Sequence, residues 1–504
     1  MAVVPKRRIS PRRRRLTLPP AQTPPVNSPP AQSPPPTPPT SPGAPPAAPG
    51  SPPSSGGGAA PGPVLSAEMV DRLFWRAGFG PTQADRSTWT GRTVGEAVDW
   101  LLDTPQGAPV GPQATLSGQP IDPLAGITEL VLAWVGRMVS SANPLVERLT
   151  LFWHRHWACS RDDVDHLFML RQNELFRRYA DLGANPGANF RTLAYEASED
   201  PAMLRYLSGE LNRSGRPNEN YARELMELFC LGVADAAGNP NYTETDVREL
   251  ARALSGWQVN TSDPDNPRGV FVSSRFDNGT KSFLGRSGNF GSRQAVDIVL
   301  AHPVHPGFIV RKLWSEFIVG APDGATLADL TATYTGNGLQ LKPLLRKLLT
   351  HPQLFDSLSE PTLIKPPIVY VAGAFRQLGL NVVNSGPYSR LREMGQLPYF
   401  PPNVSGWEYG PAFLTTNAAL NRWGFGSDLV SRSEVTPADV VGESAQAALD
   451  RAYAASGRPW LAAQTRAAMV DYATRAPVSN SSSRRARQLL LRAMALSGPD
   501  SHVM

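Results

Sequence analysis

Two glutamates three residues apart raise the question of chemistry in this sequence. The stretch NENYARELMELFCLG sets them beside a run of leucines, together with an arginine and two asparagines. The candidate catalytic residues are therefore Glu224, Glu227, Arg223, Asn218 and Asn220. On a helix, two carboxylates at this spacing could share a divalent metal or exchange protons with a substrate.

The same glutamates also have non-catalytic interpretations. Arg223 lies on the same stretch, and Arg248 and Arg252 lie four residues apart on the helix predicted next. Three alternatives are open for Glu224 and Glu227: salt bridges that hold helices together, a metal or acid–base site, or exposure to solvent. Because a charge at the edge of a core needs a partner, we predict that both glutamates approach an arginine or a histidine.

A histidine pair in FWHRHW is the second source of chemistry. The apolar spacing around it is helical, and residues two apart on a helix point about 200° apart. We therefore predict that His156 is buried and hydrogen-bonded, and that His154 is free to act elsewhere. The predicted metal ligands are His154, Glu224 and Glu227, which would hold a divalent metal whose identity the sequence does not specify.

Other histidines and the cysteines carry weaker signals. In HPVHP, His302 is predicted to be a helix cap or a site residue, and His305 to lie on the surface. With only two cysteines, Cys159 and Cys230, a disulfide framework is excluded. Both are predicted to be small core residues, with a single bridge between them left open.

The elements that must position these groups are almost all helical. Ser66 is a candidate helix cap, and Thr243 with Asp246 forms a capping box before a helical apolar pattern. Few stretches of the sequence have a pattern typical of β-strands. The sequence predicts a mainly α fold, a large multi-helix single domain with a short β excursion near 258–292, preceded by a disordered N-terminal arm.

Composition divides the chain into segments. We predict a basic disordered arm over 1–15, a Pro-rich disordered linker over 16–63, a main helical domain over 64–430, and C-terminal helices over 431–504 that pack on it. Residues 1–63 carry seven Lys and Arg and no acid, against a net charge of +6 for the whole chain, so the rest is close to neutral. This balance argues against a nucleic-acid-binding protein.

The arm also bears on partners and localisation. It is either a tether or a contact for acidic polymer or lipid. KRRISPRRRRLTL is similar to the charged start of an export signal, but a proline-rich stretch follows where an apolar one is needed. We therefore expect no transmembrane span and a cytoplasmic protein as written, or an exported one if the start codon is misassigned.

Several long motifs together resemble the bacterial family known as domain of unknown function 1800. The motifs include LTLFWHRHWACS, RPNENYARELMELFCLG, YTETDVRELARALSGW, HPVHPGFIVRKLW and PPNVSGWEYG. The resemblance implies a large helical protein, often exported, with a protein partner encoded nearby. The chain departs from the family pattern at Phe276, where a histidine is expected, and by an eight-residue insert, ADAAGNPN, before Tyr242.

Two functions from different classes follow. The first is an enzyme, a metal-dependent hydrolase that uses the histidine, glutamate and arginine cluster to activate water. The alternative is a non-catalytic envelope-associated or assembly protein that acts through a partner.

Overall fold

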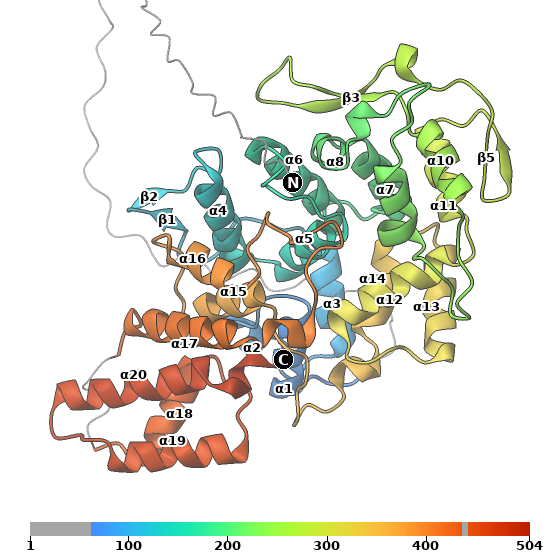
Figure 1. Ribbon diagram of the computed structural model, residues 1–504. Helices are drawn as coiled ribbons and strands as arrows, with labels where there is room; N and C mark the ends of the chain where they lie inside the picture. Colours follow the sequence, from blue (N-terminus) through green and yellow to red (C-terminus); the bar gives the residue numbers. More distant parts are fainter. Residues whose placement is uncertain (1–61, 436–441) are drawn as a thin grey trace, which may run out of the picture. The chain divides into compact units, whose positions relative to one another are not determined.

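The computed structural model describes residues 62–435 and 442–504, and these residues belong to one compact unit, Gly56–Met504. They form twenty α-helices and three two-stranded hairpins, which confirms the mainly α prediction (Figure 1). The predicted arm and nearly all of the predicted linker, residues 1–61, lie outside the described part. The boundary between residues 64–430 and 431–504 remains a prediction.

The first ten helices include the buried helix α5, which packs against α3, α4 and α6. Their bounds are α1 (Ala67–Arg76), α2 (Gln83–Trp89), α3 (Val94–Asp103), α4 (Ile127–Ser140), α5 (Pro144–His156), α6 (His166–Ala180), α7 (Phe190–Glu199), α8 (Pro201–Tyr206), α9 (Asn220–Glu224) and α10 (Glu244–Ala253). A π-helix, η2 (Leu225–Cys230), continues α9 directly.

The later helices begin beyond the hairpins. Their bounds are α11 (Ser292–Leu300), α12 (His305–Phe317), α13 (Gly324–Gly336), α14 (Leu341–Leu349), α15 (Pro367–Gln377), α16 (Gly386–Glu393), α17 (Thr416–Ser431), α18 (Ala445–Ala455), α19 (Ala463–Arg475) and α20 (Ser481–Ser497). Among the described residues, no helix is long and apolar enough to cross a membrane.

The strands are short antiparallel hairpins. β3 (Trp257–Asn260) pairs with β4 (Arg268–Phe271), and β5 (Lys281–Phe283) pairs with β6 (Arg286–Gly288). Both lie in the predicted β excursion. A third hairpin, β1 (Thr115–Leu116) with β2 (Gln119–Pro120), falls in a stretch whose sequence indicates a loop.

α5 is the central helix of the fold. All of its residues except Arg155 are buried, as expected for a helix that is covered on every face. Glu147, on this helix, is fully buried and forms ion pairs of 2.7 Å with Arg177 and 2.9 Å with Arg137. It also accepts a hydrogen bond of 2.7 Å from the indole nitrogen of Trp134. Burial alone would raise the pKa of Glu147, but the two arginines bring it below its ordinary value.

The C-terminal helices form an apolar cluster of their own. α18, α19 and α20 pack together through small and aliphatic side chains, and α20 also packs on α17. Beyond α20 the chain returns into the body, where Val503 pairs with Ile364 and Arg76 donates two hydrogen bonds to the main-chain oxygen of Met504. The last residues therefore help to hold α1 in place.

The capping box predicted from the sequence is confirmed. Thr243 is the N-cap of α10; its hydroxyl accepts from the amide of Asp246, and the Asp246 side chain accepts from the amide of Thr243. Ser66 caps α1 as predicted. Both cysteines are buried and free, so the bridge left open does not form.

We predict that Thr243→Ala lowers the free energy of unfolding by about 1 kcal/mol, because the first turn of α10 loses its side-chain acceptor. Urea unfolding followed by circular dichroism measures the change. Thr245→Ala, a neighbouring exposed threonine inside the same helix, is the control and should change stability by a few tenths of a kcal/mol at most. Equal midpoints for the two variants would contradict the capping role.

We predict that Glu147→Gln lowers the free energy of unfolding by about 3–5 kcal/mol, because it leaves two arginines near the core without their carboxylate. The control is Glu174→Gln, which removes a half-buried ion pair of 2.8 Å with Arg171 and should cost less than about 1 kcal/mol. Thermal unfolding of both variants measures the difference. A Glu147→Gln variant as stable as the Glu174→Gln control would show that this ion-pair cluster does not hold the helices together.

Candidate functional site

The π-helix η2 occupies the stretch in which the sequence predicts a regular helix. Its hydrogen bonds are one residue longer than those of an α-helix, as shown by the amide of Leu231, which donates to the carbonyl of Met226 at 2.8 Å. The segment ends at Gly232, whose φ of +81° is a conformation that favours glycine. Short π-helical turns are uncommon and are frequent at functional sites.

Three side chains from other helices bind the carbonyl groups at the end of η2. Lys312 Nζ donates to the carbonyl of Leu228 at 2.6 Å, and His156 Nε2 and His305 Nδ1 lie 3.0 and 3.1 Å from the next two carbonyl oxygens. The last carbonyls of a helix otherwise lack partners. Side chains from α5 and α12 therefore stabilise the irregular end of η2.

These contacts determine the tautomers of both histidines. A carbonyl only accepts, so His156 carries its proton on Nε2 and presents a bare Nδ1, 3.4 Å from Lys312 Nζ. His305 carries its proton on Nδ1, and its Nε2 accepts from the hydroxyl of Tyr334 at 3.3 Å. Burial lowers the pKa of His305 to about 4 and that of His156 well below its ordinary value, so both rings are neutral at physiological pH.

The prediction that His305 lies on the surface is wrong. The side chain is fully buried because it supplies the hydrogen bond to a carbonyl of η2. His156 is buried and hydrogen-bonded, as predicted. His302 is half-buried, and its Nδ1 accepts from the amide of Val304 at 3.4 Å, a contact of the cap type at the entrance to α12.

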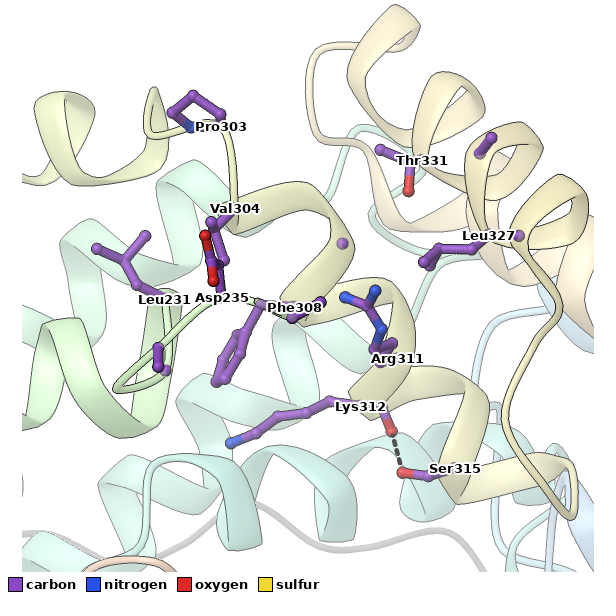
Figure 2. A pocket seen from close by; sticks show the side chains of 16 residues that line it. Leu231, Asp235, Pro303, Val304, Phe308, Arg311, Lys312, Ser315, Leu327 and Thr331 are labelled. Atoms are coloured by element: carbon purple, nitrogen blue, oxygen red, sulfur yellow. Dashed lines mark hydrogen bonds between the residues drawn. The ribbon is translucent and has the colours of Figure 1, made fainter. Parts of the chain in front are cut away.

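A cavity of about 880 Å³ lies between the segment that follows η2, α12 and α13 (Figure 2). Its walls include Leu231, Phe308, Leu327 and Thr331, and the insert contributes Asp235. The size is typical of pockets that enclose small molecules. The segment by which the chain departs from the family pattern thus forms part of the cavity wall.

Lys312 reaches this cavity from α12. Its aliphatic chain extends beneath the ring of Phe308, and Nζ lies 4.8 Å from the ring centre (Figure 2). Burial, together with the nearby charge of Arg155, lowers the pKa of Lys312 to about 7. A large fraction of the amine is therefore unprotonated at neutral pH, which is the form in which lysine acts as a nucleophile or base.

Arg311 gives the same cavity a positive charge. It is exposed and points toward the side formed by Leu327 and Thr331, away from the amine of Lys312 (Figure 2). In residues 62–435 and 442–504, Arg311 forms no salt bridge. An unpaired guanidinium at a cavity wall can bind a carboxylate or a phosphate in a bidentate manner.

Lys312 and Arg311 were not among the residues predicted from the sequence. The sequence does contain a pattern that points to Lys312. This lysine follows Phe308 by four residues and Ile309 by three, so it lies at the edge of an apolar helical face. A charged group in such a position either extends to solvent or becomes buried. Only the tertiary structure shows that the amine of Lys312 contacts the carbonyl of Leu228 and the ring of His156.

The glutamates of the opening stretch lie at half-buried positions on α9 and η2. Glu227 accepts a hydrogen bond of 3.2 Å from the hydroxyl of Tyr242. Burial, and after it the charge of Glu227, raise the pKa of Glu224 above its ordinary value. The structure does bring the two carboxylates close enough to influence each other.

The arginines predicted as partners bind other acids. Arg223 donates two hydrogen bonds to Glu244, of 2.8 and 2.7 Å, and forms an ion pair with Glu219 at 3.3 Å. Arg248 lies 3.6 Å from Glu219 as well. Arg252 pairs with two other acids, Glu249 and Asp277. Neither Glu224 nor Glu227 forms a salt bridge in the described part of the chain, so the expected arginine contacts are not found there.

The two asparagines organise the backbone before α9. The side-chain oxygen of Asn218 accepts from the amide of Asn220 at 3.1 Å, and the amide of Asn218 donates to Asn212 at 3.1 Å. Asn220 is exposed. The two asparagines therefore fix the backbone at the start of α9.

His154 lies in an aromatic enclosure. Its Nε2 accepts from the amide of Tyr399 at 3.1 Å, so the lone pair that a metal would need on that nitrogen is occupied. Its ring packs against Trp134, Tyr399 and Trp407. Burial lowers the pKa of His154 to about 3.

Within the described residues, no group of three or more His, Cys, Asp and Glu side chains could hold a metal ion. The structure therefore does not bring His154 together with Glu224 and Glu227, because its ring belongs to the aromatic enclosure. A metal held by the two glutamates would need its remaining ligands from carbonyls, water or substrate.

Comparisons with known proteins identify the chain only at the level of the family. No curated protein and no solved structure matches it. The match to the family described as "Protein of unknown function (DUF1800)" extends over residues 72–501, and the chain therefore belongs to that family, as its motifs predicted.

Proposed function

We propose that this chain is an enzyme whose reacting group is the amine of Lys312, and that its substrate is a small anionic carbonyl compound. The observation that carries the proposal is the position of Lys312 Nζ, held between the carbonyl of Leu228 and Nδ1 of His156 at the wall of an 880 Å³ cavity. Lysines that are buried without a carboxylate partner are suited to such chemistry.

The hydrogen bonds of the amine favour the reactive form. A neutral lysine has two N–H groups and one lone pair. Donation to Leu228 and to the bare Nδ1 of His156 uses both N–H groups and leaves the lone pair free for a substrate. His156 acts here as a positioning residue, because its own proton is held by the carbonyl of Phe229.

The reaction that follows is imine formation. The lone pair attacks the substrate carbonyl and a C–N bond forms. The nitrogen then gives up both of its protons, and the carbonyl oxygen takes up two and leaves as water, so that a neutral imine remains. Arg311 supports an anionic substrate, since it supplies positive charge on another part of the same cavity. A substrate that reached both groups would extend past Phe308.

A second candidate function keeps the hydrolysis predicted from the sequence. What supports it is the pair Glu224 and Glu227: burial favours the protonated form of Glu224, while Glu227 accepts a hydrogen bond from Tyr242. Two carboxylates in unequal environments can serve as acid and base. In this version a divalent metal would bind the two glutamates without His154. The non-catalytic alternative, a protein that acts through a partner, requires neither site to react.

We predict that pyridoxal 5′-phosphate followed by borohydride labels Lys312 at pH 7.5 at least about ten times faster than Lys347, a surface lysine, because about half or more of the Lys312 amine is neutral there. Peptide mass mapping over a time course measures both rates. Labelling should rise through about pH 7. Lys312→Met should remove the fast-reacting site, whereas Lys347→Met should leave it unchanged. Equal rates at the two lysines would rule out the lysine mechanism and favour the glutamate pair or a non-catalytic role.

We predict that the wild type gains about 2 kcal/mol more in the free energy of unfolding than Lys312→Met does between pH 7 and pH 9. The pKa of this lysine is about 7 in the folded chain and about 10 when unfolded, so the unfolded state holds more protons in this interval and stability rises with pH. Urea unfolding at both pH values measures the difference. Lys347→Met should follow the wild type, and parallel curves for Lys312→Met would show that the amine has an ordinary pKa.

A further inference from the structure

A second cavity, of about 440 Å³, lies where α1 meets the segment before α15 and the C-terminal helices. We propose that it binds a small molecule that joins a planar ring to an anionic group, such as a carboxylate or a phosphate. This site is separate from the Lys312 cavity and does not depend on the proposed reaction. The lining residues that carry the argument are Arg72, Trp75, Lys365, Arg458, Trp460 and Arg466.

The cations of this cavity are bound mainly to neutral groups. Arg72 donates three hydrogen bonds, all to main-chain carbonyls, and Lys365 Nζ donates to the carbonyl of Ser501 at 2.6 Å. Arg466 stacks on the ring of Tyr453, 4.5 Å from its centre. None of these contacts neutralises charge, so the positive charge is available to an anionic ligand.

Two acids line the same cavity and offset part of that charge, since Asp71 also acts on Lys365 and Arg458. Asp71 is already bound to Arg86, at 2.6 Å, and Glu68 accepts from the hydroxyl of Ser66 at 2.9 Å. Against them stand four cations on the cavity wall. Burial lowers the pKa of Lys365 to about 7, and a bound anion would favour its charged form.

The rings of the cavity supply a place for a planar group. Trp460 is half-buried, and its indole nitrogen donates to the carbonyl of Ser359 at 2.7 Å, which fixes the ring. In the described part of the chain no other aromatic ring stacks on it. One face of Trp75 is covered by the Lys365 ammonium at 3.7 Å. We therefore place the planar group of the ligand against Trp460, which has no stacked ring or cation among the described residues.

The backbone before Trp460 is held in an unusual conformation. Gly457 and Arg458 have φ values of +78° and +52°, and the second is uncommon for a residue with a side chain. The carbonyl of Gly457 accepts from Arg86 at 2.5 Å, and the amide of Arg458 donates to Tyr453 at 2.9 Å. The turn places the exposed Arg458 at the cavity, two residues before Trp460, so a ring and a cation come from one rigid segment.

Calorimetric titration of the full chain with adenosine monophosphate, indole-3-acetate and 1-naphthoate tests the proposal. We expect at least one of them to bind, and adenosine or inorganic phosphate alone to bind at least about tenfold more weakly than the compound that joins both groups. Binding by none of the three, or equal affinity for the separate ring and anion, would overturn the inference.

Variants locate the site. Arg458→Gln combined with Arg466→Gln should weaken binding at least about tenfold, and Trp460→Leu should do the same through the lost stacking. Arg286→Gln, at an exposed arginine far along the chain, is the matched control and should bind as the wild type does. If Trp460→Leu does not fold, the double variant of Arg458 and Arg466 and the variant Trp460→Phe test the site in its place. Lys312→Met should leave the affinity of this cavity for the ligand unchanged, so the test of this site is independent of the reaction proposed for Lys312. Undiminished binding by the arginine double variant would refute the site.

Discussion

Two consecutive buried charges on the central helix fix the arrangement on which the candidate site depends. Glu147 and Arg148 are both fully buried, and they pair with opposite neighbours: Glu147 with Arg177 and Arg137, and Arg148 with Glu316 at 3.0 Å. A buried charge without a partner is strongly destabilising, and each of these two charges lies within ion-pair distance of an opposite one. The pairs therefore specify which helices surround α5, while the apolar surface supplies the stability.

The Arg148–Glu316 pair also sets the geometry around Lys312. Lys312 lies one helical turn before Glu316 on α12, and His156 lies about two turns after Arg148 on α5. The two helices thus touch at two charged or polar points, Arg148 with Glu316 and His156 with Lys312. Tyr409 and Arg155 also contact Glu316, which ties the carboxylate further. A shift of α12 along α5 would break both contacts at once, so the position of the amine depends on the packing of these two helices.

The features that follow from local pattern could be predicted from the sequence, and those that depend on tertiary contacts could not. The helical class, the capping box at Thr243 and the burial of His156 each rest on spacing within one segment. The π-helix does not, because its extra residue per turn is stabilised by side chains from α5 and α12 that bind its carbonyls. The same contacts bury His305, for which the sequence predicts a surface position. α17, between Thr416 and Ser431, likewise has no clear helical pattern in its sequence, because its glycines and asparagines weaken it.

The ion-pair partners of the arginines also depend on tertiary contacts that the sequence does not reveal. Helical spacing correctly identifies Arg223 as able to reach Glu219, four residues before it, but not that Glu244 competes for the same guanidinium from the next helix. With Arg223 and Arg252 bound elsewhere, Glu224 and Glu227 are left facing each other and Tyr242, and the pKa of Glu224 rises.

Lys312 and Lys365 differ in role: we assign a reaction to the first and only a positive charge to the second. Lys312 and Lys365 each donate to a main-chain carbonyl, and burial lowers the pKa of each to about 7. Lys365 is only 3% exposed and its ammonium is pressed against Trp75, so its polar end contributes charge to a cavity that it scarcely enters. Lys312 is half-buried, and the nitrogen of His156 beside it accepts a hydrogen bond without a competing charge. An equal shift in pKa therefore has different consequences, because access and the orientation of the lone pair, and not basicity alone, decide whether an amine can react.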